Sequence, residues 1–351
     1  SIMQKKEIPL AFGERAVVGS HYLRVARSSY DREKYIETVT FASESLRKRE
    51  TLTNEAIVEC LRLLGMAAVR TGDKDSLDNA IDELSKMRTQ QSRRHVYFIK
   101  GFDARWNGNF EIAETEFGES LKINPKDTHA LREIAQLLVM REDYVSAERY
   151  ARDSLARNPG NPFVIDILLN CLIERRKDNY SDLLEDIEIH ELFAQLEAAD
   201  RGERSDFSDL RQSHYYSALK NFAEAIKWAD SAVRKSPGQV RAYAARAEMK
   251  LRMKSDLKAL HSIEADIRQI QKLADDTNVF RKHAGLLAKL RIRFELAKGN
   301  VRAAIRHYES FPSTHGQLKR KLALEIAGEA VERREDDPDV VAFANRALAA
   351  N

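Results

Sequence analysis

The sequence has few residues that interrupt helices and few that cross-link chains. Its 351 residues include only 14 Gly, 7 Pro and 2 Cys. So little Gly and Pro argues against a loop-rich fold and favours long helices. Cys60 and Cys171 each fall inside an apolar helical stretch, where a small buried thiol is the ordinary explanation. A reducing, cytoplasmic location therefore fits best.

Long apolar runs and a large charge excess are also missing. No window approaches the roughly 18 apolar residues that span a bilayer, and the segment 9–12 lacks the apolar run of a signal peptide. We therefore expect no membrane association. The net charge of +3 is too small for a general polyanion binder. Ser1 stands where a full chain would begin with Met, which fits a piece of a larger multidomain protein.

Motifs for catalysis and metal binding are absent from the sequence. It contains no glycine-rich phosphate loop, dinucleotide fingerprint, nucleophile elbow or zinc-binding HExxH helix. The nine His are scattered, and none stands at metal-ligand spacing beside a cysteine or carboxylate cluster. We expect neither enzymatic activity nor a cofactor or metal.

What the sequence does contain is a repeat of 34 residues between His95 and Pro159. A repeat of this length indicates stacked supersecondary units, so the chain length counts repeats rather than globular domains. The repeated positions pair Gly101 with Ala135, Phe110 with Tyr144, Ala113 with Ala147, Ser120 with Ser154, and Pro125 with Pro159.

Within one repeat the pattern predicts two helices joined by a tight turn. Residues 94–108 carry apolar side chains at the three-to-four spacing of an amphipathic helix, and Asn107-Gly108-Asn109 then interrupts it. A second helix begins near Phe110 and ends at Asn124-Pro125, because proline cannot continue the hydrogen-bond ladder. Small residues at Gly101 and Ala113 are expected where the two helices cross.

This arrangement resembles the tetratricopeptide repeat (TPR) family. Lys100 departs from the Leu usual in that family, and Ser120 departs from its usual Ala. The resemblance implies an all-α, right-handed superhelical solenoid without catalytic activity. The matching positions of the first unit are Tyr97, Lys100, Gly101, Ala104, Phe110, Ala113, Phe117, Ser120 and Pro125.

The same template fits about eight units, with C-terminal capping helices, over the whole chain as a single solenoid. The 78 residues from Pro159 to Pro237 exceed two repeats by ten, which predicts a lengthened second helix in 180–200 and a polar loop over 200–209. A similar extension is expected after Ile263. The predicted ranges are 19–93 for divergent N-terminal repeats, 94–160 for the two most regular repeats, 161–205 for an enlarged repeat, 206–280 for two repeats of which the second is extended, and 281–351 for a C-terminal repeat and capping helices.

Stacked helix pairs place their first helices along a concave face, which suggests a groove for a peptide or a segment of a partner protein. Aromatic side chains there would provide most of the affinity, and polar ones would fix backbone or carboxylate groups. A slip of one residue would instead bury Phe98 and Phe102 between repeats. The predicted partner-binding residues are Phe98, Phe102, Arg105, His129, Arg132, Gln136, Asp166 and Asn170.

Family members that clamp the C-terminal carboxylate of chaperones use Lys, Asn and Arg on consecutive first helices. In this sequence Phe98, Phe102 and Glu133 replace key residues of that clamp, so the resemblance does not imply chaperone docking. We expect a protein-interaction scaffold or regulatory sensor.

The distribution of charge offers an alternative. Residues 281–334 contain thirteen Lys or Arg against five Glu, whereas residues 182–209 contain ten acids against two Arg. A solvated helix face explains the charge of either segment. Alternatively, the basic segment forms a surface that binds nucleic acid through salt-sensitive phosphate contacts. A further alternative is self-association, in which the acidic segment of one chain attracts the basic segment of another. The residues of the alternative basic surface are Arg281, Lys282, Lys289, Arg291, Arg293 and Arg302.

Overall fold

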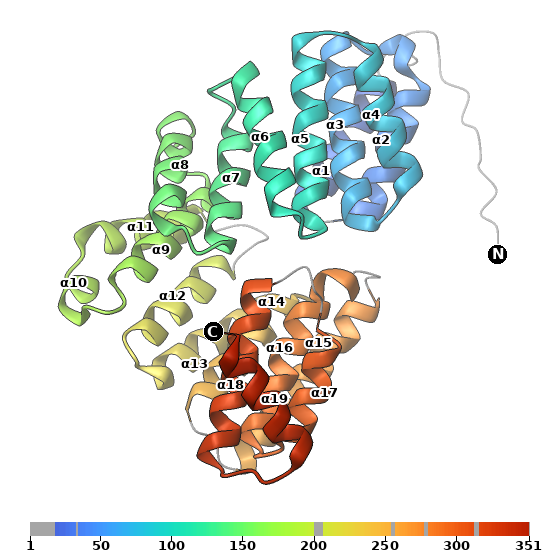
Figure 1. The fold of residues 1–351 in the computed structure, drawn as a ribbon. Coiled ribbons are helices and arrows are strands. Elements are labelled where there is room, and N and C mark those ends of the chain that lie inside the picture. Colours follow the sequence, from blue (N-terminus) through green and yellow to red (C-terminus); the bar gives the residue numbers. More distant parts are fainter. Residues whose placement is uncertain are drawn as a thin grey trace. The chain divides into compact units, whose positions relative to one another are not determined.

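The computed structural model describes residues 18–32, 34–199, 206–253, 257–276, 280–311 and 316–350. Throughout these ranges the regular secondary structure is helical and contains no strand, as Figure 1 shows. The predicted all-α class is therefore confirmed. The chain divides into two compact units, the first ending at Ala130 and the second beginning at Leu131.

Unit 1 is built from antiparallel helix pairs. The first helices α1, α3 and α5 contact one another in chain order, and each also packs against the second helix of its own pair. This is the stacking expected of helical repeats. The helices are α1 (Val18–Asp31), α2 (Tyr35–Arg47), the short 3₁₀ helix η2 (Arg49–Thr51), α3 (Asn54–Thr71), α4 (Lys74–Lys86), α5 (Gln90–Trp106) and α6 (Phe110–Ile123), while α7 (Thr128–Met140) crosses the boundary between the units.

Unit 2 continues with the same design. Its first helices α9, α12, α14, α16 and α18 contact one another in that order. The last pair, α18 and α19, matches the two predicted capping helices. The bounds are α8 (Tyr144–Arg157), α9 (Pro162–Arg176), α10 (Tyr180–Leu184), α11 (Ile187–Ala199), α12 (Phe207–Ala218), α13 (Phe222–Lys235), α14 (Val240–Arg252), α15 (Leu257–Asp276), α16 (Phe280–Ala297), α17 (Val301–Glu309), α18 (Gly316–Glu332) and α19 (Pro338–Ala349).

One turn recurs between the two helices of a pair. A residue with positive φ ends the first helix, and the next residue donates its N–H to a carbonyl five positions earlier, which closes the helix in a Schellman motif. The turn is present at Gly72-Asp73, Gly108-Asn109, Glu142-Asp143, Lys220-Asn221, Gly299-Asn300 and Arg334-Glu335. In most of these turns the second residue then caps the following helix, as when Asp143 accepts from the N–H of Ser146.

The enlarged repeat differs from the prediction. Residues 180–199 form two helices, α10 and α11, rather than one lengthened helix, because the chain leaves helical geometry at Glu185-Asp186. Asp186 then accepts a hydrogen bond from the N–H of Ile189 and starts α11. The predicted polar loop also ends early, since α12 already begins at Phe207. The extension after Ile263 is a single helix, α15, of 20 residues.

Helices α5 and α6 pack closely where they cross at Gly101. A Cβ atom added to Gly101 would lie 2.8 Å from the ring of Phe117, which is fully buried. Gly101→Val is therefore expected to lower the free energy of unfolding by about 1–3 kcal/mol, the usual range for overpacking a core. Urea unfolding followed by circular dichroism measures the change. Gly118→Val provides the control, because a Cβ at Gly118 meets no atom within 4 Å; an equal loss in both variants would contradict the packing explanation.

Candidate partner-binding surface

A line of partly exposed side chains follows the first helices of unit 2, and we call it the first-helix surface. On α9 it comprises Phe163, Asp166, Asn170 and Glu174, whose spacing of three and four residues places them on one side of the helix. The opposite side of α9 is filled by Ile165, Leu169, Leu172 and other buried residues, which hold the helix in the stack. The polar line is therefore presented by a packed scaffold.

Arg211 of α12 organises the centre of this surface. Its Nε donates to Asp166 Oδ1 at 2.8 Å and its Nη2 to Asp166 Oδ2 at 2.9 Å. This bidentate geometry fixes the planes of the guanidinium and of the carboxylate. Its Nη1 donates to Asn170 Oδ1 at 2.7 Å. The predicted residues Asp166 and Asn170 are thus brought together by a residue that the sequence analysis did not select.

The same arginine fixes the tautomer of His214. Because a guanidinium only donates, His214 Nδ1 accepts from Arg211 and its Nε2 carries the proton that is donated to Glu174 at 2.7 Å. Burial lowers the pKa of His214, so the ring is neutral near neutral pH. Burial alone would raise the pKa of Glu174, but hydrogen bonds from His214 and Lys177 outweigh it and lower that pKa to about 2.

Two aromatic rings lie at the start of the first-helix surface. Phe163 of α9 and Phe207 of α12 meet edge to face, with ring centroids 5.2 Å apart. The guanidinium carbon of Arg132 lies 5.6 Å from the Phe163 centroid, and that of Arg241 lies 4.4 Å from the Phe207 centroid. Arg241 is also held by Asp206 through two hydrogen bonds of 2.7 and 2.8 Å. The result is a line of arginine, phenylalanine, phenylalanine and arginine over four first helices.

The predicted basic surface is largely neutralised by neighbouring side chains. Lys289 pairs with Glu248, and Arg293 donates to Glu325 at 2.7 and 2.9 Å. Arg302 pairs with Asp337. Arg291 donates to Gln271 at 3.0 Å, and the side chains of Arg281 and Lys282 lie outside the described residues.

The aromatic anchors predicted in unit 1 do not reach solvent. Phe98 is 1% exposed and Phe102 is 0% exposed, so neither side chain presents a surface to a ligand. Phe98 packs against Phe117, with ring centroids 5.7 Å apart. Phe102 stacks on Trp106, and the guanidinium groups of Arg70 and Arg105 lie over its ring. The expectation that Phe98 and Phe102 line an open groove is corrected here: the same helix face is covered by large side chains from neighbouring helices.

The remaining predicted residues stay at the surface to different degrees. His129 is exposed and lies with its ring centroid 6.4 Å from that of Phe98. Arg105 is partly exposed, with its guanidinium carbon 5.1 Å from the Phe102 centroid. Arg132 and Gln136 are partly exposed on α7, and Arg132 also donates to Glu133 at 2.7 Å. The structure therefore leaves His129, Arg105, Arg132 and Gln136 at least partly accessible, unlike Phe98 and Phe102.

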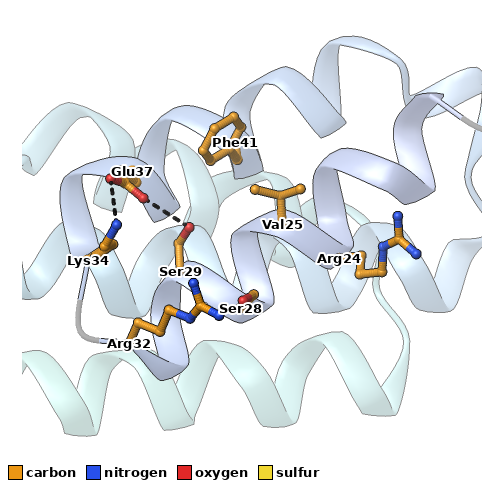
Figure 2. Close-up of a pocket in the computed structure, with 8 residues that line it drawn as sticks. All are labelled: Arg24, Val25, Ser28, Ser29, Arg32, Lys34, Glu37 and Phe41. Atoms are coloured by element: carbon orange, nitrogen blue, oxygen red, sulfur yellow. Dashed lines mark hydrogen bonds and ion pairs between the residues drawn. The ribbon is translucent and has the colours of Figure 1, made fainter. Parts of the chain in front are cut away.

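A surface pocket of about 500 Å³ lies between α1 and α2 of unit 1 (Figure 2). Arg24 extends from α1 and Arg32 from the turn that follows it, while Val25 and Phe41 provide apolar lining. Glu37 accepts hydrogen bonds from Lys34 and Ser29 at 3.3 and 3.4 Å, as the dashed lines in Figure 2 show. Much of the polar lining is thus paired internally, and we assign no ligand to this pocket.

Cys60 and Cys171 are both fully buried, as predicted. Burial raises the pKa of the Cys60 thiol to about 11 and that of Cys171 to about 12, so neither forms a thiolate at neutral pH. Among the described residues no three His, Cys, Asp or Glu side chains are grouped so as to hold a metal ion. None of the helices described in the structure has the length and apolar character needed to cross a membrane.

Comparison with solved structures establishes the fold. A Rap protein complexed with Competence and Sporulation Factor has a TM-score of 0.67 and 13% identity, covering 96% of this chain and 97% of that chain. The human IFIT1 dimer with m7Gppp-AAAA has a TM-score of 0.58 and 12% identity, covering 95% and 77%. The apo form of RapI has a TM-score of 0.54 and 12% identity, covering 94% and 97%. No family model and no curated protein matches the sequence. The fold is that of the TPR-like helical-repeat proteins.

Proposed function

We propose that this protein is a non-catalytic interaction scaffold or regulatory sensor that binds a peptide or a segment of a partner protein on the first-helix surface of unit 2. The observation that carries the proposal is the Phe163 and Phe207 pair beside the network that joins Asp166, Asn170 and Arg211. Partly exposed aromatic rings provide apolar contact area, and fixed polar groups beside them recognise backbone amides or charged side chains. A Rap protein with the same TPR-like fold is complexed with Competence and Sporulation Factor.

The polar groups of this surface are already oriented. Arg211 loses little further side-chain freedom when a ligand binds, because Asp166 and Asn170 hold its guanidinium in place. Preorganisation of this kind raises affinity by lowering the entropy cost of ordering the interface. Arg132 and Arg241 lie at the two ends of the aromatic pair and pack over its rings. Because Glu133 and Asp206 already pair with these two arginines, we assign no charge preference to the ligand there.

Arg211→Ala is expected to weaken peptide binding at least tenfold, about 1.4 kcal/mol, because it releases Asp166, Asn170 and His214 together. Peptides selected from a random library on the wild-type chain, titrated by calorimetry, provide the measurement. Arg234→Ala is the matched control, since Arg234 is exposed on the second helix α13. Circular dichroism confirms that both variants are folded. Equal affinity of the selected peptides for both variants would place the binding surface elsewhere.

Nucleic-acid binding is the alternative function, and human IFIT1 with m7Gppp-AAAA shows that this fold holds RNA in another protein. Here the carboxylates of Glu248, Glu325 and Asp337 form ion pairs with three of the predicted basic side chains. Phosphate binding would have to displace them, so we favour the peptide. A gel shift with single-stranded RNA at low salt separates the two functions: retention that is lost in Arg302→Ala would support the alternative.

A further inference from the structure

The enlarged repeat exposes three large apolar side chains within eight residues. Tyr180 is 59% exposed, Leu184 is 42% exposed and Ile187 is 73% exposed. Tyr180 and Leu184 stand four residues apart on one side of α10, and Ile187 is the first residue of α11. Single exposed apolar residues are common on protein surfaces, but a concentration of this kind marks an interaction site.

These side chains are displayed by a rigid support. Leu183, Ile189 and Leu196 are fully buried and fix α10 and α11 onto the stack, where α11 contacts both α9 and α12. The Nε2 atom of His190 lies 2.8 Å from the carbonyl oxygen of Leu184 and joins the two helices. The exposed apolar residues therefore do not belong to a segment that could fold inward and bury them.

Unpaired carboxylates surround the apolar residues. The sequence from Asp178 to Ala199 contains seven acids and no Lys or Arg. Asp186 and Glu188 reach back to Arg176 and Arg152. In contrast, Asp182, Glu185 and Glu191 are exposed and make no ion pair with any residue that the structure describes, although ion pairs are frequent along the rest of unit 2.

We infer that Tyr180, Leu184 and Ile187, together with Asp182, Glu185 and Glu191, form a docking surface for a basic amphipathic segment of a partner protein. We call this set the α10–α11 patch. Apolar side chains of the partner would cover the three exposed residues, and its Lys or Arg would neutralise the three carboxylates. Charge complementarity selects this occupant, because an acidic or uncharged segment would leave the carboxylates unpaired at the rim. The inference is independent of the function proposed for the first-helix surface.

The probe is a labelled helical peptide of Leu and Lys, with Leu on one face, and its binding to the full chain is measured by fluorescence anisotropy. We expect binding that weakens with added salt, because screening reduces the attraction between exposed charges. The triple substitution Tyr180→Ser, Leu184→Ser and Ile187→Ser is expected to lower the affinity at least tenfold. The triple substitution Asp182→Asn, Glu185→Gln and Glu191→Gln is expected to lower it and to remove the salt dependence.

Two controls separate the patch from general stickiness. Val331→Ser, at a residue that is 63% exposed on α18, should leave the affinity unchanged. A peptide with Ser in place of Leu should bind at least tenfold more weakly than the Leu peptide. No binding by the wild-type chain, or equal binding by the wild type and both triple variants, would overturn the inference.

Sedimentation velocity tests the other occupant, a second copy of this chain. A dimer that forms with increasing protein concentration and is abolished by the apolar triple substitution would assign the patch to self-association and overturn the separate partner. A monomer at all concentrations supports the inference when the peptide binds as expected. Arg211→Ala should leave this peptide's affinity unchanged, which keeps the result distinct from the function proposed above.

Discussion

Phe102→Ala is expected to lower the free energy of unfolding of the helices in unit 1 by about 3–5 kcal/mol, the usual cost of removing a buried phenylalanine. The side chain is fully buried and touches three neighbours at once. Its ring centroid lies 6.2 Å from that of Trp106, and the guanidinium carbons of Arg70 and Arg105 each lie 5.1 Å from it. Truncation therefore removes apolar burial, a ring contact and two cation–π contacts.

Hydrogen exchange read out by mass spectrometry measures this change locally, which suits a repeat protein whose helices need not unfold together. Amides of α3 and α5 should lose protection, whereas those of α14 to α19 should not. Ile112→Ala is the control, because Ile112 is 55% exposed on α6. Unchanged protection of α5 in Phe102→Ala, together with weaker partner binding, would restore Phe102 as a surface anchor.

The architecture could be predicted because the same physical requirement recurs in every repeat. Small residues are needed where helices cross, and the Cβ position of Gly101 shows why. The turn between paired helices also recurs from Gly108 to Glu142 to Lys220 at spacings of 34 and 78 residues, the spacings found in the sequence. Each repeat contains the information for its own helices, so a local pattern was sufficient.

Burial along the first helices could not be predicted from one repeat. Phe102 is covered in part by Arg70, which belongs to the preceding pair and stands 32 residues earlier. The caps Thr53 and Thr89 are 36 residues apart rather than 34, so the phase of the regular repeats does not extend unchanged into the N-terminal pairs. Whether a position on this face is open depends on such cross-repeat contacts.

The candidate site was predicted only in part for a related reason. Asp166 and Asn170 follow the 34-residue phase and were found, whereas Arg211 lies beyond the enlarged repeat, where that phase is lost. A usable signal was present: Phe207, Arg211 and His214 stand at spacings of four and three residues on one side of α12, and Phe207 begins that helix much as Phe163 stands near the start of α9. Reading forward from the start of each first helix, rather than from a fixed period, would have aligned the two aromatic residues.

Acid is expected to destabilise unit 1 through His95, whose side chain is 8% exposed on α5. Burial, followed by the nearby charges of Arg94 and Arg62, lowers the pKa of His95 to about 3 from an ordinary value of 6.5. The Arg94 guanidinium already faces the ring Nε2 at 2.9 Å, and Nδ1 finds no hydrogen-bond partner among the residues that the structure describes. The site therefore disfavours the imidazolium.

The sign of the pH effect follows from which state binds the proton. Between pH 6.5 and about 3 the unfolded chain is protonated at His95 and the folded chain is not, so stability falls as the pH falls. The slope is about 1.4 kcal/mol per pH unit, which amounts to roughly 3 kcal/mol between about pH 6.5 and about pH 4.5. His95→Leu should remove this part of the slope, measured by urea unfolding at several pH values, whatever its effect at neutral pH. His21→Gln, at an exposed residue of α1, should retain the wild-type slope. If His95→Leu and the wild type lose stability in parallel as the solution is acidified, the acid sensitivity comes from other groups and His95 is accommodated as a cation in the folded chain.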